Sequence, residues 1–230
     1  MKHIASLLLV FSVFLIVSCD GSEEPDPTDL GYDFYPINPA AYRIYQVDEI
    51  KYDLLGPDTT NYQIRETISD SLMSESGIVS YVLKREKRTD SSDVWQTDSL
   101  WTLRKDQSAV VITENNVPVI KLSFPVVDGK VWDGNALNIK PSQSFYYEIP
   151  ESLIELYTLI EAERLVKVIS ADLEPNLVNQ DQRFDVYASE IGLIEKNYIT
   201  LNFCTANCES VGEVQSGRIL NQYLIEYGEK

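Results

Sequence analysis

The chain has 230 residues, with 36 acidic and 19 basic side chains, and its formal net charge at pH 7 is -17. This balance excludes a general nucleic-acid binder, since nucleic acids are held largely through Lys and Arg on their phosphates, and it disfavours docking on anionic lipid head groups. Hydrophobic residues make up 44% of the chain, which is enough for a sizeable core.

The first 18 residues have the organisation of a lipoprotein signal peptide. Lys2 and His3 form a short basic start, and the apolar run 4–17 that follows is too short for a membrane span of about 20 residues. Ile16-Val17-Ser18-Cys19 resembles a bacterial lipobox, in which the cysteine is acylated and becomes the new N-terminus. We expect Cys19 to carry the lipid (palmitate or a similar acyl chain). The alternative is an ordinary cleaved signal with an incidental cysteine.

Loss of this signal peptide also removes the single histidine of the chain, His3. A mature chain without histidine has no Ser-His or Cys-His nucleophilic pair and no His-containing zinc, copper or iron site. We therefore expect no enzyme activity, no cofactor and no metal site.

Residues 19–30 are predicted to be a flexible tether. Residues 20–29 are acidic, contain two prolines and have no apolar side chain to bury. An acidic patch after the acylated cysteine resembles the surface-export signal of Bacteroidetes-type lipoproteins. Asp20 directly after the cysteine resembles the inner-membrane retention signal of other Gram-negative lipoproteins. We expect a lipid anchor in the outer membrane at the cell surface, with the periplasmic face as the alternative.

Residues 31–230 are expected to form one β-rich domain, because period-two alternation of β-branched and aromatic residues recurs throughout them. The predicted strands are 42–52, 62–68, 79–84, 95–103, 109–113, 119–124, 145–149, 165–169, 184–188, 191–196, 198–203 and 219–227. Trp95, Thr97, Ser99, Trp101 and Leu103 are expected to share one face of their strand.

Turn residues separate these strands. Asn115-Asn116 predicts a tight turn, and Pro118 predicts an edge strand or a bulge just after it. Gly129 and Gly134 are expected to supply positive φ angles in a loop-rich passage. Pro150 is expected to open the single helix, over 151–163, with an apolar face formed by Leu153, Ile154, Leu156, Tyr157 and Ile160.

Short links between successive strands predict antiparallel neighbours, since parallel pairs need long crossovers. The fold class is therefore mainly β: an antiparallel, strongly curved sheet or partly open barrel with one short helix. A β-sandwich is the alternative.

Three features are candidate sites. Cys204 and Cys208 are expected to form a disulfide that closes a loop, with a redox or metal pair as the alternative. The loop that begins at Asp128 invites a calcium interpretation, but Lys130 and Ile139 stand where an EF-hand needs ligands, so paired turns are favoured. Trp95, Trp101 and Trp132 are either core residues or a stacking platform for a ligand.

Four segments together resemble a group of Bacteroidetes-type outer-membrane or surface lipoproteins. They are Tyr35-Pro36, the block from Leu122-Ser123-Phe124-Pro125 to Trp132-Asp133-Gly134-Asn135-Ala136, Ala188-Ser189-Glu190-Ile191-Gly192-Leu193-Ile194, and the ending from Ser216-Gly217 to Leu224-Ile225-Glu226-Tyr227-Gly228. The resemblance implies kinship and location, and it brings no activity with it.

Two functions remain open at this level. The first is a non-catalytic envelope protein with an accessory role, which binds another envelope protein or a glycan. The second is a carrier of a lipid or other hydrophobic ligand in a cavity of the curved sheet, which closed or partly open β-barrels make readily.

Overall fold

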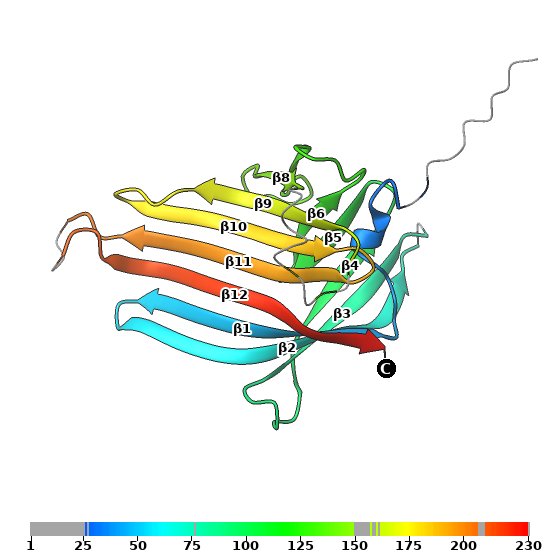
Figure 1. Ribbon diagram of the computed structural model, residues 1–230, viewed down its shortest axis with the longest axis horizontal. Coiled ribbons are helices and arrows are strands. Elements are labelled where there is room, and N and C mark those ends of the chain that lie inside the picture. The colour runs from blue at the N-terminus through cyan, green and yellow to red at the C-terminus, as the bar shows by residue number, and fades with distance from the viewer. Residues whose placement is uncertain are drawn as a thin grey trace, which may run out of the picture.

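The computed structural model describes residues 26, 28–75, 77–149, 157, 160, 162–206 and 210–229. Within them, twelve antiparallel strands form one sheet that curls into a nearly closed barrel (Figure 1). The strands are β1 (Ala41–Asp53), β2 (Gly56–Met73), β3 (Val79–Arg88), β4 (Gln96–Lys105), β5 (Ala109–Glu114), β6 (Val117–Ser123), β7 (Val131–Asp133), β8 (Ser144–Glu148), β9 (Leu165–Leu173), β10 (Asn179–Ala188), β11 (Gly192–Phe203) and β12 (Val214–Glu229).

The order of the strands across the sheet is β6-β5-β4-β3-β2-β1-β12-β11-β10-β9-β8-β7. Consecutive strands of the chain pair with one another except β6 and β7, which stand at the two ends of this order, and β1 also pairs with β12. The predicted antiparallel, strongly curved sheet is thus confirmed. The helix expected over 151–163 lies mostly outside the described residues. Among the described residues, one 3-10 turn, η2 (Tyr32–Phe34), is present. No helix of the described residues has the length and apolar character needed to cross a membrane.

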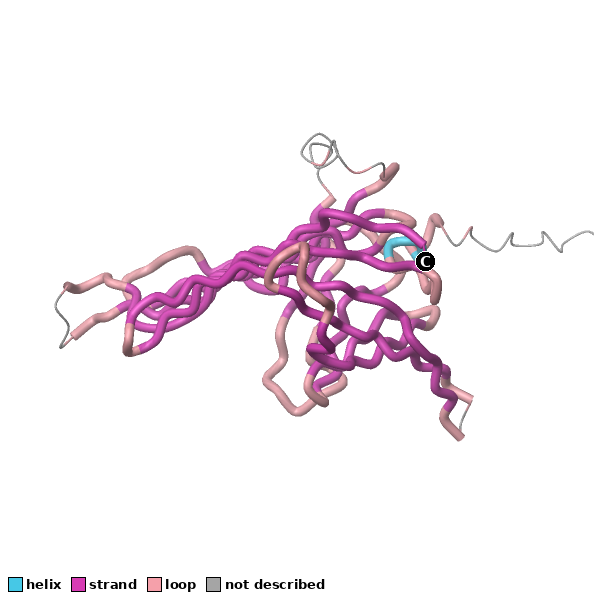
Figure 2. Tube along the Cα trace, turned by 90° about the horizontal axis from the view of Figure 1, so that it is seen from below, coloured by secondary structure: helices cyan, strands magenta, loops and turns pink. Residues whose placement is uncertain are grey.

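Strand length divides the sheet into two parts. β2 and β12 have 18 and 16 residues, whereas β5 to β8 have between 3 and 7. β3 pairs with β2 only as far as Gln63, so the first half of β2 has β1 as its one strand neighbour. The long strands therefore run on beyond the barrel as a single layer, which we call the wing (residues 49–61, 170–183, 198–206 and 210–219). Figure 2 shows this layer edge-on.

The barrel closes where β6 meets the segment that carries β7 and β8. The amide of Ile120 donates to the carbonyl of Gly134 at 2.9 Å, and the Trp132 indole donates to the carbonyl of Ile120 at 3.0 Å. The Tyr147 hydroxyl accepts from the amide of Ser123 at 2.8 Å and donates to its carbonyl at 3.0 Å. These contacts partly satisfy the backbone groups that an edge strand leaves unpaired.

The core fills the barrel with large aromatic and branched side chains. Four tyrosines, Tyr35, Tyr45, Tyr147 and Tyr187, are almost completely buried among Leu83, Leu103, Leu122, Val47, Val110, Val166 and Val168. Tyr45 donates a hydrogen bond to the carbonyl of Leu193. A tyrosine core of this kind buries much apolar area while its hydroxyls still require polar partners.

Several local predictions are confirmed. Asn115 and Asn116 have φ angles of 51° and 63°, as the tight turn between β5 and β6 requires. β6, which contains Pro118, lies at an edge of the sheet, where the missing N–H of proline costs least. The predicted strands 191–196 and 198–203 are one continuous strand, β11.

Two predictions are wrong. Gly129 has a φ of 72°, but Gly134 does not have a positive φ. Gly134 is instead required by packing, because a Cβ there would lie 2.6 Å from the Phe145 ring. The residues from Trp95 to Leu103 do not share one face, because a bulge opposite Arg85 and Glu86 shifts the register of β4.

We expect Tyr147→Phe to lower the free energy of unfolding by about 1–3 kcal/mol, because it removes both hydrogen bonds to Ser123. Tyr146→Phe, on the neighbouring residue, should change it by less than about 0.5 kcal/mol, since its hydroxyl is exposed and its contact with Asp172 is 3.5 Å long. Urea unfolding of the two variants measures the difference. Equal losses would contradict the role of Tyr147 in closing the barrel.

Candidate functional site

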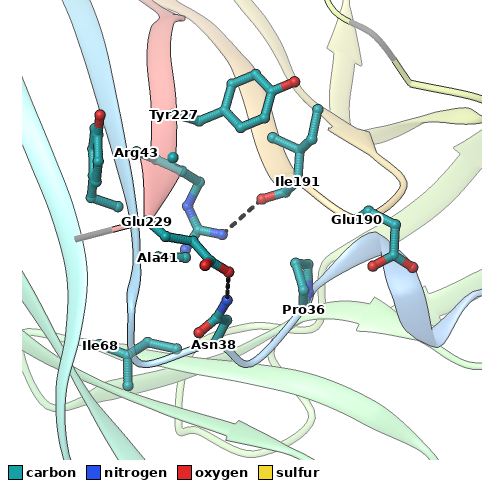
Figure 3. Close-up of a pocket in the computed structure, with 11 residues that line it drawn as sticks. Pro36, Asn38, Ala41, Arg43, Ile68, Glu190, Ile191, Tyr227 and Glu229 are labelled. Carbon is teal, nitrogen blue, oxygen red and sulfur yellow. Dashed lines mark hydrogen bonds between the residues drawn. The ribbon is translucent and has the colours of Figure 1, made fainter.

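A pocket of about 350 Å³ opens at the end of the barrel opposite the wing. Five parts of the chain line it: the segment before β1, the start of β1, Ile68 on β2, the turn between β10 and β11, and the end of β12. Its lining residues include Pro36, Asn38, Arg43, Ile68, Glu190, Ile191, Tyr227 and Glu229 (Figure 3). The volume lies in the lower part of the range found for small-molecule sites.

Arg43 is the residue on which this pocket is built. It is only 7% exposed, and its Nη1 donates to the carbonyl of Ile191 at 2.9 Å. Its Nε has no hydrogen-bond partner among the described residues, and no described carboxylate lies within ion-pair distance of it. Its guanidinium carbon lies 5.3 Å from the centre of the Tyr35 ring. A buried cation without an ion-pair partner is unusual, because burying an unpaired charge is costly.

The nearest compensating carboxylate on the barrel wall is already engaged. Arg43 lies opposite Glu66 in the β1–β2 ladder, and Glu66 lies opposite Arg85 in the β2–β3 ladder. Arg85 Nε donates to Glu66 Oε1 at 3.0 Å. The row thus contains two arginines and one carboxylate, which pairs with Arg85, and it keeps an excess positive charge next to the pocket.

Gly192 makes room for the guanidinium. Its φ is 97°, and a Cβ at this position would lie 2.6 Å from Arg43 Nη1. Any other residue would combine an unfavourable backbone angle with a clash against the cation. The turn after β10 is therefore shaped to fit Arg43.

Acidic side chains form the rim of the pocket. Glu229 accepts from the Asn38 amide at 2.7 Å, as Figure 3 shows, and Glu226 accepts from the Tyr42 hydroxyl at 2.7 Å. Glu190 is exposed and also lines the pocket. The pocket thus combines a deep cation with carboxylates at its mouth.

A second polar group lies on the inner wall of the barrel. Asp185, Lys196 and Gln222 are directly opposite one another across β10, β11 and β12, and each is at most 8% exposed. Asp185 Oδ1 and Gln222 Nε2 have no hydrogen-bond partner among the described residues. Burial lowers the pKa of Lys196, and the nearby Asp185 opposes this shift.

Across the barrel from this row, Glu114 and Lys121 form an ion pair at 3.2 Å. Burial alone would raise the pKa of Glu114, but Lys121 and Lys196 lower it to about 2. Burial likewise opposes the charge of Lys121, but Glu114 raises its pKa above the ordinary value. The inner wall is therefore charged as well as aromatic.

The wing has two unlike faces. Its inner face, continuous with the barrel wall, carries charged and hydroxyl side chains, among them Glu49, Lys51, Asp181, Arg183, Thr200 and Arg218. Its outer face carries Ile50, Tyr52, Ile199, Leu201 and Ile219 in adjacent register positions. Within the wing only one sheet layer is present, so no second sheet covers this apolar face (Figure 2).

The three tryptophans do not form a common platform. Trp95 lies against Arg65 and Arg88, whereas Trp101 lies against Arg85. Arg65 and Glu66 are adjacent on β2 and so point to opposite faces of the sheet. Because Glu66 pairs with Arg85, the arginine contacts of Trp95 and Trp101 also lie on opposite faces. Trp132 is held at the barrel closure. Each indole is thus occupied by its own intramolecular contacts.

The predicted cysteine sites fall largely outside the described residues. Cys19 and Cys208 both lie there, so the lipid attachment and the disulfide stay predictions. Cys204 is buried just after β11, and its amide donates to the carbonyl of Glu213 at 2.8 Å. In the part of the chain that the structure describes, no group of three or more His, Cys, Asp or Glu residues is arranged to hold a metal ion.

Sequence reasoning missed Arg43. The only indication available was a charged residue at an inward position of an alternating strand, flanked by Tyr42 and Ile44. The position of Arg43 opposite Glu66 and its contact with the 191–192 turn depend on the sheet topology, which hydrophobic alternation along one strand does not reveal.

Comparison with known proteins does not place the chain in a family: no protein-family model, no curated protein and no solved structure matches it.

Glu114→Gln should flatten the pH dependence of stability. A folded pKa of about 2 against an ordinary 4.5 means that this group stabilises the fold above pH 4.5 and loses that contribution as the pH falls towards 2. The variant should also lose about 3 kcal/mol at neutral pH, because Lys121 is left buried without its partner.

Urea unfolding at several acidic pH values measures this slope. The exposed Glu75→Gln is the matched control and should keep the slope of the original protein. An unchanged pH dependence of the unfolding free energy in Glu114→Gln would contradict the lowered pKa of Glu114.

Proposed function

We propose that the protein is a non-catalytic lipoprotein of the outer membrane, held at the cell surface by an acylated Cys19, and that it binds a partner protein of the envelope through its wing. The observation that carries the proposal is the exposure of large apolar side chains at the three turns of the wing tip. Leu54 and Leu55 are 95% and 98% exposed, Leu177 is 83% exposed and Val211 is 71% exposed.

The position of the N-terminal end supports presentation of the wing. The described chain begins at the barrel end, far from the turns that join β1 to β2, β9 to β10 and β11 to β12 (Figure 1). The ten residues from Cys19 to Thr28, joined by nine Cα–Cα steps, reach at most about 32 Å. An anchor at Cys19 would therefore keep the barrel end near the membrane and leave the wing tip to reach away from it.

The chemistry of the turns favours a protein partner. Residues 53–58, 173–179, 203–206 and 210–214 contain no Lys or Arg, and they include Asp53, Asp58, Glu174 and Glu213. Acidic groups beside the apolar side chains oppose insertion into an anionic bilayer. They fit a protein recess that is apolar at its centre and basic at its border, because charge complementarity of this kind orients partners.

The inner wall of the barrel supports this proposal over a carrier of hydrophobic ligands. Core side chains already fill the barrel, and an apolar ligand among them would also lie against the charged groups of Asp185, Lys196, Glu114 and Lys121, to which it offers no polar partner. Binding of a partner protein at the surface does not require an apolar cavity in the interior.

Substitution Cys19→Ser should abolish acylation. In cells fed with labelled palmitate, we expect label on the original protein and none on the variant, which should move from the membrane to the soluble fraction. Membrane retention and label in Cys19→Ser would contradict the anchor and leave the proposal for the wing to be judged separately.

A photoreactive amino acid at Leu55, or separately at Leu177, should yield the same discrete protein adduct in intact cells, because both turns face one partner. Val94 is the matched control, since it is apolar and as exposed as Leu177 but lies in the β3–β4 connection. The double change Leu54→Ser and Leu55→Ser should remove the adduct formed at Leu177.

Two outcomes would overturn this proposal. One is an adduct pattern at Leu55 and Leu177 that is the same as at Val94, which would mean random collision. The other is co-sedimentation of the purified protein with phosphatidylcholine vesicles that is lost in the double serine variant, which would make a lipid surface the target.

A further inference from the structure

The pocket at Arg43 is independent of the wing, and its chemistry is specific enough to name a ligand class. We propose that it binds a small zwitterion, a free amino acid or a short peptide, with the carboxylate of the ligand on Arg43 and its ammonium group at the acidic rim. The pocket lies at the end of the barrel where β1 begins and β12 ends (Figure 3).

The anionic half of the ligand is set by Arg43. The guanidinium lines the pocket, is 93% buried, and makes one hydrogen bond, to the carbonyl of Ile191. Its planar fork of donors matches the two oxygens of a carboxylate. Because Glu66 is already paired with Arg85, a ligand carboxylate would neutralise the excess positive charge of this row.

The cationic half is set by Glu190 and Glu229. Both carboxylates line the same pocket as Arg43, from two different parts of the chain. A simple anion such as phosphate would be repelled by this rim, whereas a ligand with both charges satisfies the rim and the base together. Pro36, Ile68 and Tyr227 supply apolar wall for the carbon skeleton between the two charges.

The surrounding residues hold the Arg43 guanidinium and the acidic rim in place. Gly192 leaves space that any side chain would take from Arg43 Nη1, and Asn38 positions Glu229 through a 2.7 Å hydrogen bond. The volume of about 350 Å³ suits a ligand the size of a dipeptide better than a lipid or an oligosaccharide.

Isothermal titration calorimetry of the purified full-length protein with three probes tests the inference. The probes are alanyl-alanine, its N-acetyl derivative, which lacks the ammonium group, and its C-terminal amide, which lacks the carboxylate. Saturable binding of alanyl-alanine is expected, and each modified probe should bind at least about tenfold more weakly, which is the usual effect of one lost charge-assisted hydrogen bond.

Variants assign the two ends of the ligand. Arg43→Gln should abolish binding of alanyl-alanine, whereas Arg104→Gln, on β4 outside this pocket, should leave it unchanged. Because Arg43 is buried and its loss can unfold the chain, the exposed Glu190→Gln provides a second test. It should weaken alanyl-alanine and leave the N-acetyl probe unaffected, so that the difference between the two probes shrinks.

Three results would overturn the inference. They are no saturable heat with alanyl-alanine or any common free amino acid at about 10 mM, equal binding of the three probes, and a folded Arg43→Gln variant that binds as well as the original protein. None of these results bears on the wing.

Discussion

The unequal length of neighbouring strands is the constraint from which the shape of this protein follows. A strand of 16 or 18 residues spans about 50–60 Å at 3.3 Å per residue, more than a barrel of this size can use along its wall. The short strands β5 to β8 complete a barrel over only part of that length. The remainder has to continue as a single layer, and its connecting turns must gather at one end, far from the N-terminal segment. The two candidate surfaces are consequences of this division.

Closure of the barrel has its own electrostatic consequence. Alternation sends every second side chain of the long strands inward, and several of these are charged, such as Glu66 on β2 and Lys196 on β11. Some are paired with a neighbouring strand, as Glu66 is with Arg85 and Glu114 is with Lys121. Arg43 has no such ion pair among the described residues, because it lies at the open end, where its guanidinium meets a turn and a pocket rather than a strand. Its unpaired charge therefore follows from its place in the topology.

The sequence predicts the elements well and their relations poorly. Alternation located the strands, and local chemistry located the Asn115-Asn116 turn, because both depend on near neighbours. The face of Trp95 could not be predicted, since the bulge that moves it is a property of its pairing with β3. For the same reason the sequence suggests a positive φ at Gly134, although the Phe145 ring, eleven residues later in the sequence, is what excludes a side chain there. The pocket could not be predicted either, because it forms only where the segments near residues 40, 190 and 229 meet in the fold.

One strand carries both surfaces. Arg43 lies near the start of β1 and Leu54 follows its end, which places them about 35 Å apart along the strand. β1 is hydrogen-bonded on both sides along its length, to β2 and β12, so it is the most constrained strand of the sheet. A strand held in this way does not slide in register, because a shift of one residue would turn every inward side chain outward. Binding at the pocket and binding at the wing tip are therefore separated energetically, because sites this far apart with no shared partner contribute additively. In the proposed function, the barrel is the rigid spacer between the anchored end and the wing tip.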